Sequence, residues 1–332
     1  KIAVFIFMRI LLLGGNGFGK VHAQSYKNLG IDFSVFSRNR EVLEEYKENY
    51  DVTSTFDDIN QAMKSDFDAV DIVLPHNLHL EYSIKAMEMG KHVLVEKPIA
   101  TTIEDAKKMI NLAKKMKVNF MVAEQYFFDS GLRHALSLIS NNAIGKIHTI
   151  IIRDQRHFTK SGVWRTQEST MGGGALIDGG IHFIEALLDI GGLYDEVHSF
   201  SYGGGSTIQG ESNTAAILSF RSGAKGILFY SWGYPYAPVL PSYEIVGTEG
   251  SIVEDLKTKP KEDFKTMKSP RHAFGLPVLN GKVSEVKIND VFDQEIEEFV
   301  NSIEKGTEVP YKPEMALRNL ELVMKIYGRV NG

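Results

Sequence analysis

Apolar strands alternate with helices from residue 9 to residue 123, and this alternation constrains the fold more than any other feature of the chain. Residues 9–13 (Arg-Ile-Leu-Leu-Leu) are apolar after the first, as in a parallel strand that is buried on both faces. Further strands are predicted at 32–36, 69–74, 92–95 and 119–123, and helices at 19–29, 40–50, 80–89 and 102–117. This order predicts a doubly wound α/β domain with a parallel sheet over residues 1–124.

The pattern changes after residue 124, and a chain of 332 residues is long enough for two domains. In residues 125–332, strands in hairpin order are predicted at 147–153, 197–202, 214–220, 225–232, 243–247 and 251–254. Helices are predicted at 180–190, 290–305 and 313–329, and an irregular excursion with weak strands at 257–284. We expect an α+β domain with a large, mostly antiparallel open sheet, whose closing helices can pack back on the first domain.

Charge and cysteine content narrow the possible ligands and sites. The formal net charge is −5 without any basic tract, which argues against nucleic acid or a membrane surface as partner and favours a small molecule. The chain has no cysteine, which excludes disulfides and zinc-thiolate sites and fits the cytoplasm. No stretch approaches the ~20 apolar residues of a membrane span.

The first seven residues precede a methionine. We expect residues 1–7 to extend the chain upstream of a natural start at Met8; the alternative is that they lengthen the first strand.

A glycine-rich turn directly follows the first strand and precedes the first helix. In this context glycines permit a tight turn and let backbone N–H groups meet a pyrophosphate. We prefer the register Gly14-x-Asn16-x-x-Gly19, with Asn in place of the second glycine, over one that starts at Gly15 and ends on Lys20. The residues expected to hold a dinucleotide are Gly14, Asn16, Gly17, Phe18 and Gly19, and a plain structural turn is the alternative.

The end of the second strand bears on which dinucleotide binds. An NAD site normally has Asp or Glu here for the ribose 2′-hydroxyl, whereas this chain has Ser37 and Arg38. Ser37 can donate a hydrogen bond to a 2′-phosphate and Arg38 can form a charge-assisted pair with it. We therefore expect NADP(H) to be preferred, with NAD(H) possible; the alternative for Arg38 is a solvated loop charge.

Polar residues follow two further strands of the predicted sheet. Pro75 and His79 follow strand 69–74, and Glu96 and Lys97 end strand 92–95, so we expect all four to line the cofactor site. Pro98 stops that strand and holds Lys97 at a rigid edge.

A second polar pair lies in the other half of the chain. Asp178 and His182 are four residues apart, which is one face of a helix, and with Lys97 they make an acid/base set. A helix-surface pair and a metal site are the alternatives, but no third ligand at metal spacing accompanies them.

Together these motifs resemble the Gfo/Idh/MocA oxidoreductase family, which is named for glucose-fructose oxidoreductase and inositol dehydrogenase. The resemblance spans essentially the whole chain and rests on residues 14–23, Leu74-Pro75 with His79, 90–98, 173–182 and 247–251. It implies an N-terminal Rossmann domain, an open-sheet C-terminal domain and a nicotinamide between them. It also implies that Lys97, Asp178 and His182 are catalytic and that the Lys97-Pro98 peptide is cis.

The residue types suit hydride transfer between nicotinamide and an alcohol or carbonyl carbon. His182 would exchange the hydroxyl proton, Lys97 would stabilise alkoxide charge, and Asp178 would hold a substrate hydroxyl or orient the imidazole. Trp164 and Arg165 can form a sugar platform, or else pack the domain. Tyr126 lies in a segment more aromatic than the family pattern and is the remaining substrate candidate.

The predicted function is thus an NADP(H)-dependent oxidoreductase acting on a sugar, polyol or related small molecule. The alternatives are a dinucleotide-binding sensor on the same scaffold and a reductase of dihydrodiols or unsaturated rings. Alternating apolar residues in the second sheet, such as Ile217 and Ile227, leave one face to cover, which predicts a homodimer or homotetramer.

Overall fold

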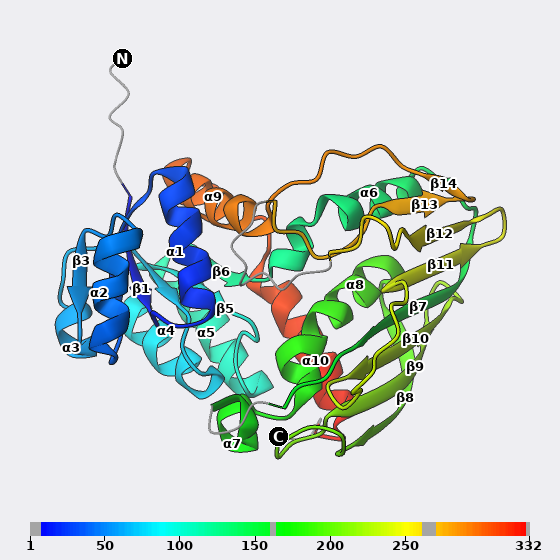
Figure 1. Ribbon diagram of the computed structural model, residues 1–332, viewed down its shortest axis with the longest axis horizontal. Helices are drawn as coiled ribbons and strands as arrows, with labels where there is room; N and C mark the ends of the chain where they lie inside the picture. Colours follow the sequence, from blue (N-terminus) through cyan, green and yellow to red (C-terminus); the bar gives the residue numbers. More distant parts are fainter. Residues whose placement is uncertain (1–7, 160–163, 261–269, 330–332) are drawn as a thin grey trace.

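The first half of the chain forms a six-stranded parallel sheet of order β3-β2-β1-β4-β5-β6, which confirms the predicted Rossmann domain (Figure 1). The computed structural model describes residues 8–159, 164–260 and 270–329, so the predicted extension at 1–7 lies outside the described residues. The strands are β1 (Arg9–Leu13), β2 (Asp32–Phe36), β3 (Ser54–Phe56), β4 (Ala69–Ile72), β5 (His92–Glu96) and β6 (Phe120–Ala123). The helices are α1 (Phe18–Leu29), α2 (Arg40–Asn49), α3 (Ile59–Ala62), η1 (His76–Leu78), α4 (His79–Glu88) and α5 (Ile103–Met116).

The second half forms an eight-stranded sheet of order β14-β13-β12-β11-β7-β10-β9-β8. Its strands are β7 (Ile147–Gln155), β8 (Tyr194–Tyr202), β9 (Asn213–Phe220), β10 (Lys225–Ser231), β11 (Tyr243–Gly247), β12 (Ser251–Glu254), β13 (Pro277–Leu279) and β14 (Lys282–Val283). The helical segments are η2 (Gln125–Phe128), α6 (Ser130–Ser140), η3 (Trp164–Thr166), α7 (Glu168–Met171), η4 (Leu176–Gly180), α8 (Ile181–Gly191), α9 (Val291–Glu304) and α10 (Pro313–Ile326).

Two features of the second half differ from the sequence prediction. The strands do not follow hairpin order throughout, because β10 pairs with β7 in parallel. The chain leaves β7, forms β8 at the far edge and returns through β9, so β10 arrives beside β7 in the same direction. Helix α6 was not predicted, although Asp129 caps it by accepting a hydrogen bond from the Leu132 N–H.

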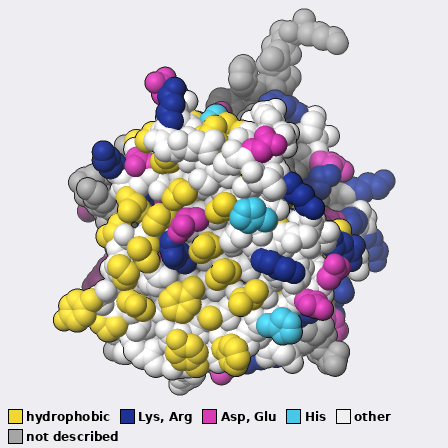
Figure 2. Space-filling model, turned by 90° about the vertical axis from the view of Figure 1, so that its right-hand side faces the viewer, with side chains coloured by type: hydrophobic (Ala, Val, Ile, Leu, Met, Phe, Trp, Pro, Cys, Tyr) yellow, Lys and Arg dark blue, Asp and Glu magenta, His cyan; other side chains and the backbone are white. Residues whose placement is uncertain are grey.

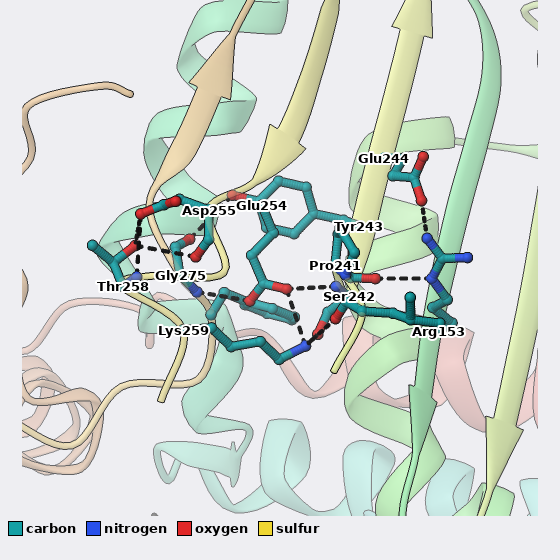
Figure 3. A network of polar contacts seen from close by, with 12 residues as sticks. Arg153, Pro241, Ser242, Tyr243, Glu244, Glu254, Asp255, Thr258, Lys259 and Gly275 are labelled. Atoms are coloured by element: carbon teal, nitrogen blue, oxygen red, sulfur yellow. Dashed lines mark hydrogen bonds and ion pairs between the residues drawn. The ribbon is translucent and has the colours of Figure 1, made fainter. Parts of the chain in front are cut away.

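The region predicted as an irregular excursion is tied to the sheet edge where it is described. The buried Glu254 carboxylate accepts hydrogen bonds from the Ser242 and Gly275 N–H groups and lies 3.1 Å from the Lys259 ammonium (Figure 3). These contacts join the start of β11, the end of β12 and the approach to β13. A buried carboxylate with several donors fixes the backbone around it, which lets β13 and β14 extend the sheet.

The helices lie on one side of the second sheet. Helices α8 and α10 occupy the space between the two sheets (Figure 1). Helix α9 packs on α1 of the first half, and α10 packs on α5. Within the described ranges, no helix combines the length and apolar character needed to cross a lipid bilayer.

The outer face of the second sheet carries exposed apolar side chains. Figure 2 shows this face, on which hydrophobic groups gather. They include Phe200 of β8, Ile217 of β9 and Ile227 of β10, with Phe200 79% exposed. Register pairs Ile217 with Ile227, so the apolar row crosses neighbouring strands.

Candidate active site

The glycine turn after β1 has the geometry of a dinucleotide site. At Gly14 (φ +114°) a Cβ atom would lie 2.2 Å from the Val73 carbonyl oxygen, and at Gly19 it would lie 1.8 Å from that of Gly14. Both positions therefore require glycine, which supports the register from Gly14 to Gly19. Gly17 (φ +59°) faces open space, and α1 begins without a side-chain cap or an acidic residue in its first turn. A helix N-terminus left open in this way fits a pyrophosphate.

Ser37 and Arg38 follow β2 at the same edge of the sheet. The Ser37 hydroxyl is buried and accepts a hydrogen bond from the Asn39 N–H at 3.3 Å. Arg38 is exposed, and its side chain forms no ion pair or hydrogen bond with the described residues. A free guanidinium at this edge fits a ribose phosphate.

Lys97 lies directly after β5, and its peptide bond to Pro98 is cis. Its ammonium donates to the Asp178 backbone carbonyl at 2.6 Å and to Asp178 Oδ1 at 2.9 Å, and the side chain is buried. His79 contacts the Pro98 and Leu74 carbonyls through its two ring nitrogens. His79 thus braces the backbone at Lys97 and leaves no ring nitrogen for the cofactor.

Asp178 contacts polar groups from three elements, and two of these groups are cations. Besides Lys97, Arg165 Nε donates to Oδ2 at 2.7 Å, and His76 Nε2 lies 3.7 Å from Oδ1. Burial alone would raise the pKa of Asp178, but Arg165 and Lys97 lower it well below its ordinary value. Asp178 is therefore a permanent anion that fixes the Lys97 ammonium.

His182, in the first turn of α8, is oriented by Glu124. Its Nδ1 lies 2.5 Å from Glu124 Oε1, and both side chains are buried. Tyr126 stacks on the imidazole with ring centroids 4.2 Å apart. Burial lowers the pKa of His182, with the Lys97 charge adding to the effect, and burial raises the pKa of Glu124 to about 8. Bonding at Nδ1 leaves Nε2 as the nitrogen available for chemistry.

The structure therefore corrects one of the two roles predicted for Asp178, the orientation of the imidazole, while the role of holding a substrate hydroxyl stays a prediction. No hydrogen bond joins Asp178 to His182 in the part of the chain that is described; Asp178 holds Lys97 instead, and Glu124 orients the imidazole. The reason is that other elements bring partners to both side chains: Lys97 and Arg165 reach the Asp178 carboxylate, and Glu124 reaches His182 Nδ1.

The predicted sugar platform lies beside this site. Trp164 contacts the His76 ring edge-on at 4.7 Å, and Arg165 stacks on Trp164 while it pairs with Asp178. Arg165 thus uses its Nε within the protein, and its partly exposed side chain keeps further N–H donors.

Sequence reasoning missed Glu124, His76 and Arg156. Arg156 pairs with Asp154 at 2.6 Å, is half exposed and acts on both Tyr126 and His182 by its charge. The position of Glu124 could have been predicted, because Glu124 directly follows a buried parallel strand at the same sheet edge as Lys97.

Across the described residues, no three His, Cys, Asp or Glu side chains are arranged to hold a metal ion.

A parallel sheet with an open glycine turn, and a lysine, an aspartate and a histidine gathered near its carboxyl edge, defines an NAD(P)-dependent oxidoreductase. Residues 8–124 match the model of an oxidoreductase family with an NAD-binding Rossmann fold, and residues 132–253 match the GFO/IDH/MocA C-terminal domain. The chain belongs to the Gfo/Idh/MocA oxidoreductase family, which confirms the resemblance.

Similar proteins act on sugars and polyols. Levoglucosan dehydrogenase of Pseudarthrobacter phenanthrenivorans is 26% identical over 91% of this chain and 90% of its own. The scyllo-inositol 2-dehydrogenase (NADP(+)) of Bacillus subtilis is 28% identical over 69% of each chain. The crystal structure of an oxidoreductase from Thermotoga maritima superposes with a TM-score of 0.84, at 25% identity, over 97% of this chain and 96% of that one.

Proposed function

We propose that the protein is an NADP(H)-dependent oxidoreductase that transfers a hydride to or from a hydroxyl or carbonyl carbon of a sugar, polyol or related small molecule. The observation that carries this proposal is the convergence of a buried Lys97–Asp178 ion pair and a buried His182–Glu124 pair near one sheet edge. A sensor that only binds dinucleotide has no need of these two pairs.

Some of these residues would bind the cofactor, and others would act on the substrate. When the dinucleotide is bound, its nicotinamide supplies the hydride acceptor or donor. The turn from Gly14 to Gly19 would hold its pyrophosphate. His182 Nε2 takes the hydroxyl proton during oxidation and returns it during reduction, while Glu124 fixes the ring through Nδ1. Lys97, anchored by Asp178, stabilises negative charge on the substrate oxygen.

Preference for NADP(H) rests on Arg38, which is exposed and unpaired among the described residues where an acidic residue would bind a free ribose hydroxyl. The name of the Bacillus subtilis relative, an NADP(+)-dependent dehydrogenase, supports the same choice. Arg38→Ala should weaken NADP(H) by about 1.5 to 3 kcal/mol, as for a hydrogen bond to a charged group, and leave NAD(H) nearly unchanged. Calorimetric titration with both cofactors checks this, and equal wild-type affinities would contradict it.

The remaining parts of the proposal concern the whole molecule. We propose that residues 1–124 and 125–332 act as cofactor and substrate domains, that the enzyme works in the cytoplasm, and that a second copy covers the apolar sheet face around Phe200.

The test is a screen of sugars, polyols and their keto forms with each cofactor, followed by the absorbance of reduced nicotinamide. His182→Ala is the matched control, because it removes the proton relay and leaves the glycine turn intact. Turnover in the wild type that His182→Ala abolishes is the expected result. Cofactor binding without turnover on any compound would favour the sensor.

A further inference from the structure

We propose that Tyr327 and Glu211 are positioning residues for the reaction, because together they cap the helix that carries Asp178 and His182. This inference rests on the proposed function, in which those two side chains act on the substrate. Tyr327 is the residue directly after α10, near the end of the chain, and Glu211 lies in the loop between β8 and β9. Both bind backbone groups of that helix, so both act through the backbone.

The two residues satisfy four successive N–H groups at the start of the helix. The Tyr327 hydroxyl accepts hydrogen bonds from the Gly174 and Ile177 N–H groups, at 3.3 and 3.2 Å. Glu211 accepts from the Ala175 N–H through its backbone carbonyl at 2.8 Å, and from the Leu176 N–H through Oε1 at 2.7 Å.

A helix leaves four such groups without partners inside itself, so this set is a complete N-terminal cap supplied from two distant segments. The next N–H, of Asp178, already bonds within the helix to the Gly174 carbonyl.

The cap is internally linked and tightly packed. The Tyr327 hydroxyl donates to Glu211 Oε1 at 2.9 Å, so one hydroxyl joins the two capping residues. A Cβ atom on Gly173 would lie 2.7 Å from the Tyr327 ring, and one on Gly174 would lie 2.0 Å from the Glu211 carbonyl oxygen. Glycine at these two positions therefore leaves the space that the cap occupies.

The cap can affect the reaction because the helical turn that contains Asp178 comes directly after it. Residues 176–180 form the π-helical segment η4, whose Asp178 carbonyl and carboxylate both bind the Lys97 ammonium. A π-helical turn is rare and occurs frequently at functional sites. Loss of the cap would let this turn relax and move Asp178 away from Lys97.

Tyr327→Phe is the test, because it keeps the ring and removes only the hydroxyl. We expect kcat to fall roughly 10- to 100-fold, as for a reacting group misplaced by about 1 Å, with cofactor affinity unchanged. The pH profile of kcat should also shift, because the Lys97 charge helps to lower the pKa of His182 and would change its position. Glu211→Gln retains an acceptor for the Leu176 N–H and should lose less activity than Glu211→Ala.

Tyr243→Phe is the matched control, because it removes a buried hydroxyl that donates to the Gly275 carbonyl in the second sheet. It should keep the wild-type kcat and pH profile. A Tyr327→Phe enzyme with wild-type kcat, or one that loses stability while its pH profile stays unchanged, would overturn the inference and leave the proposed function standing.

If the wild type turned over no substrate, the proposed function would fail instead. Amide hydrogen exchange would still report on the cap: Tyr327→Phe should speed exchange at residues 174–178, and unchanged protection there would refute the inference.

Discussion

Replacing Glu124 by Gln tests the proton relay most directly. Glu124 and His182 share a hydrogen bond in a buried setting, so the pair takes up and releases one proton as a unit. Burial raises the pKa of Glu124 to about 8, so the pair should lose its proton near that pH. Below this pH Nε2 carries a proton and suits reduction; above it, Nε2 is bare and suits oxidation. In the wild type, oxidation should therefore rise with pH through about 8 and reduction should fall.

The substitution should move this transition downward. A glutamine cannot accept the proton, and the remaining imidazole has a pKa below its ordinary 6.5, because burial and the Lys97 charge disfavour its cation. In the pH profile of kcat/KM for oxidation, the midpoint of the acid limb should thus move from about pH 8 to below pH 6.5. At high pH the variant should be slower by roughly 10- to 100-fold, which corresponds to ~1.5–3 kcal/mol for a hydrogen bond to a charged group.

The assay is the initial rate of oxidation across the pH range in parallel with a control variant. Glu295→Gln is the control, because Glu295 is a second buried carboxyl whose pKa burial raises and whose oxygens have no hydrogen-bond partner in the described structure. It should keep the wild-type profile. A limb that stays near pH 8 in Glu124→Gln would assign the ionisation to another group and refute the dyad.

Three further predictions concern separate parts of the molecule. Lys97→Ala should lower turnover by ~10²- to 10⁴-fold with little change in cofactor affinity, and calorimetry showing an equal loss of cofactor binding would contradict this role. Gly19→Ala places a Cβ 1.8 Å from the Gly14 carbonyl oxygen and should abolish dinucleotide binding and lower the melting temperature; normal binding would contradict the turn geometry. Light scattering should give a dimer or tetramer that Phe200→Asp dissociates, whereas a monomeric wild type would show that the sheet face stays open to solvent.

The sequence alone determined the architecture of the first domain, because local patterns encode it, whereas the parallel pairing of β10 with β7 in the second sheet depended on the tertiary structure. Strand β1 begins and ends as predicted. A short uninterrupted apolar run between a polar residue and a glycine is typical of a buried strand. The parallel order of the first sheet results from strand and helix alternation. The positions of Lys97 after β5 and of the glycine turn after β1 are predictable in the same way, because carboxyl ends of parallel strands share one edge.

The tertiary structure decided which of these side chains meet. Asp178 and His182 are neighbours in sequence, yet Asp178 pairs with Lys97, 81 residues away, and His182 with Glu124, 58 residues away. Periodicity assigns a residue to a face of its own helix, but it says nothing of the partner that another domain brings to that face. The π-helical turn at Asp178 also escapes the sequence, because Tyr327 and Glu211 hold it from distant segments through hydrogen bonds that form only in the folded chain.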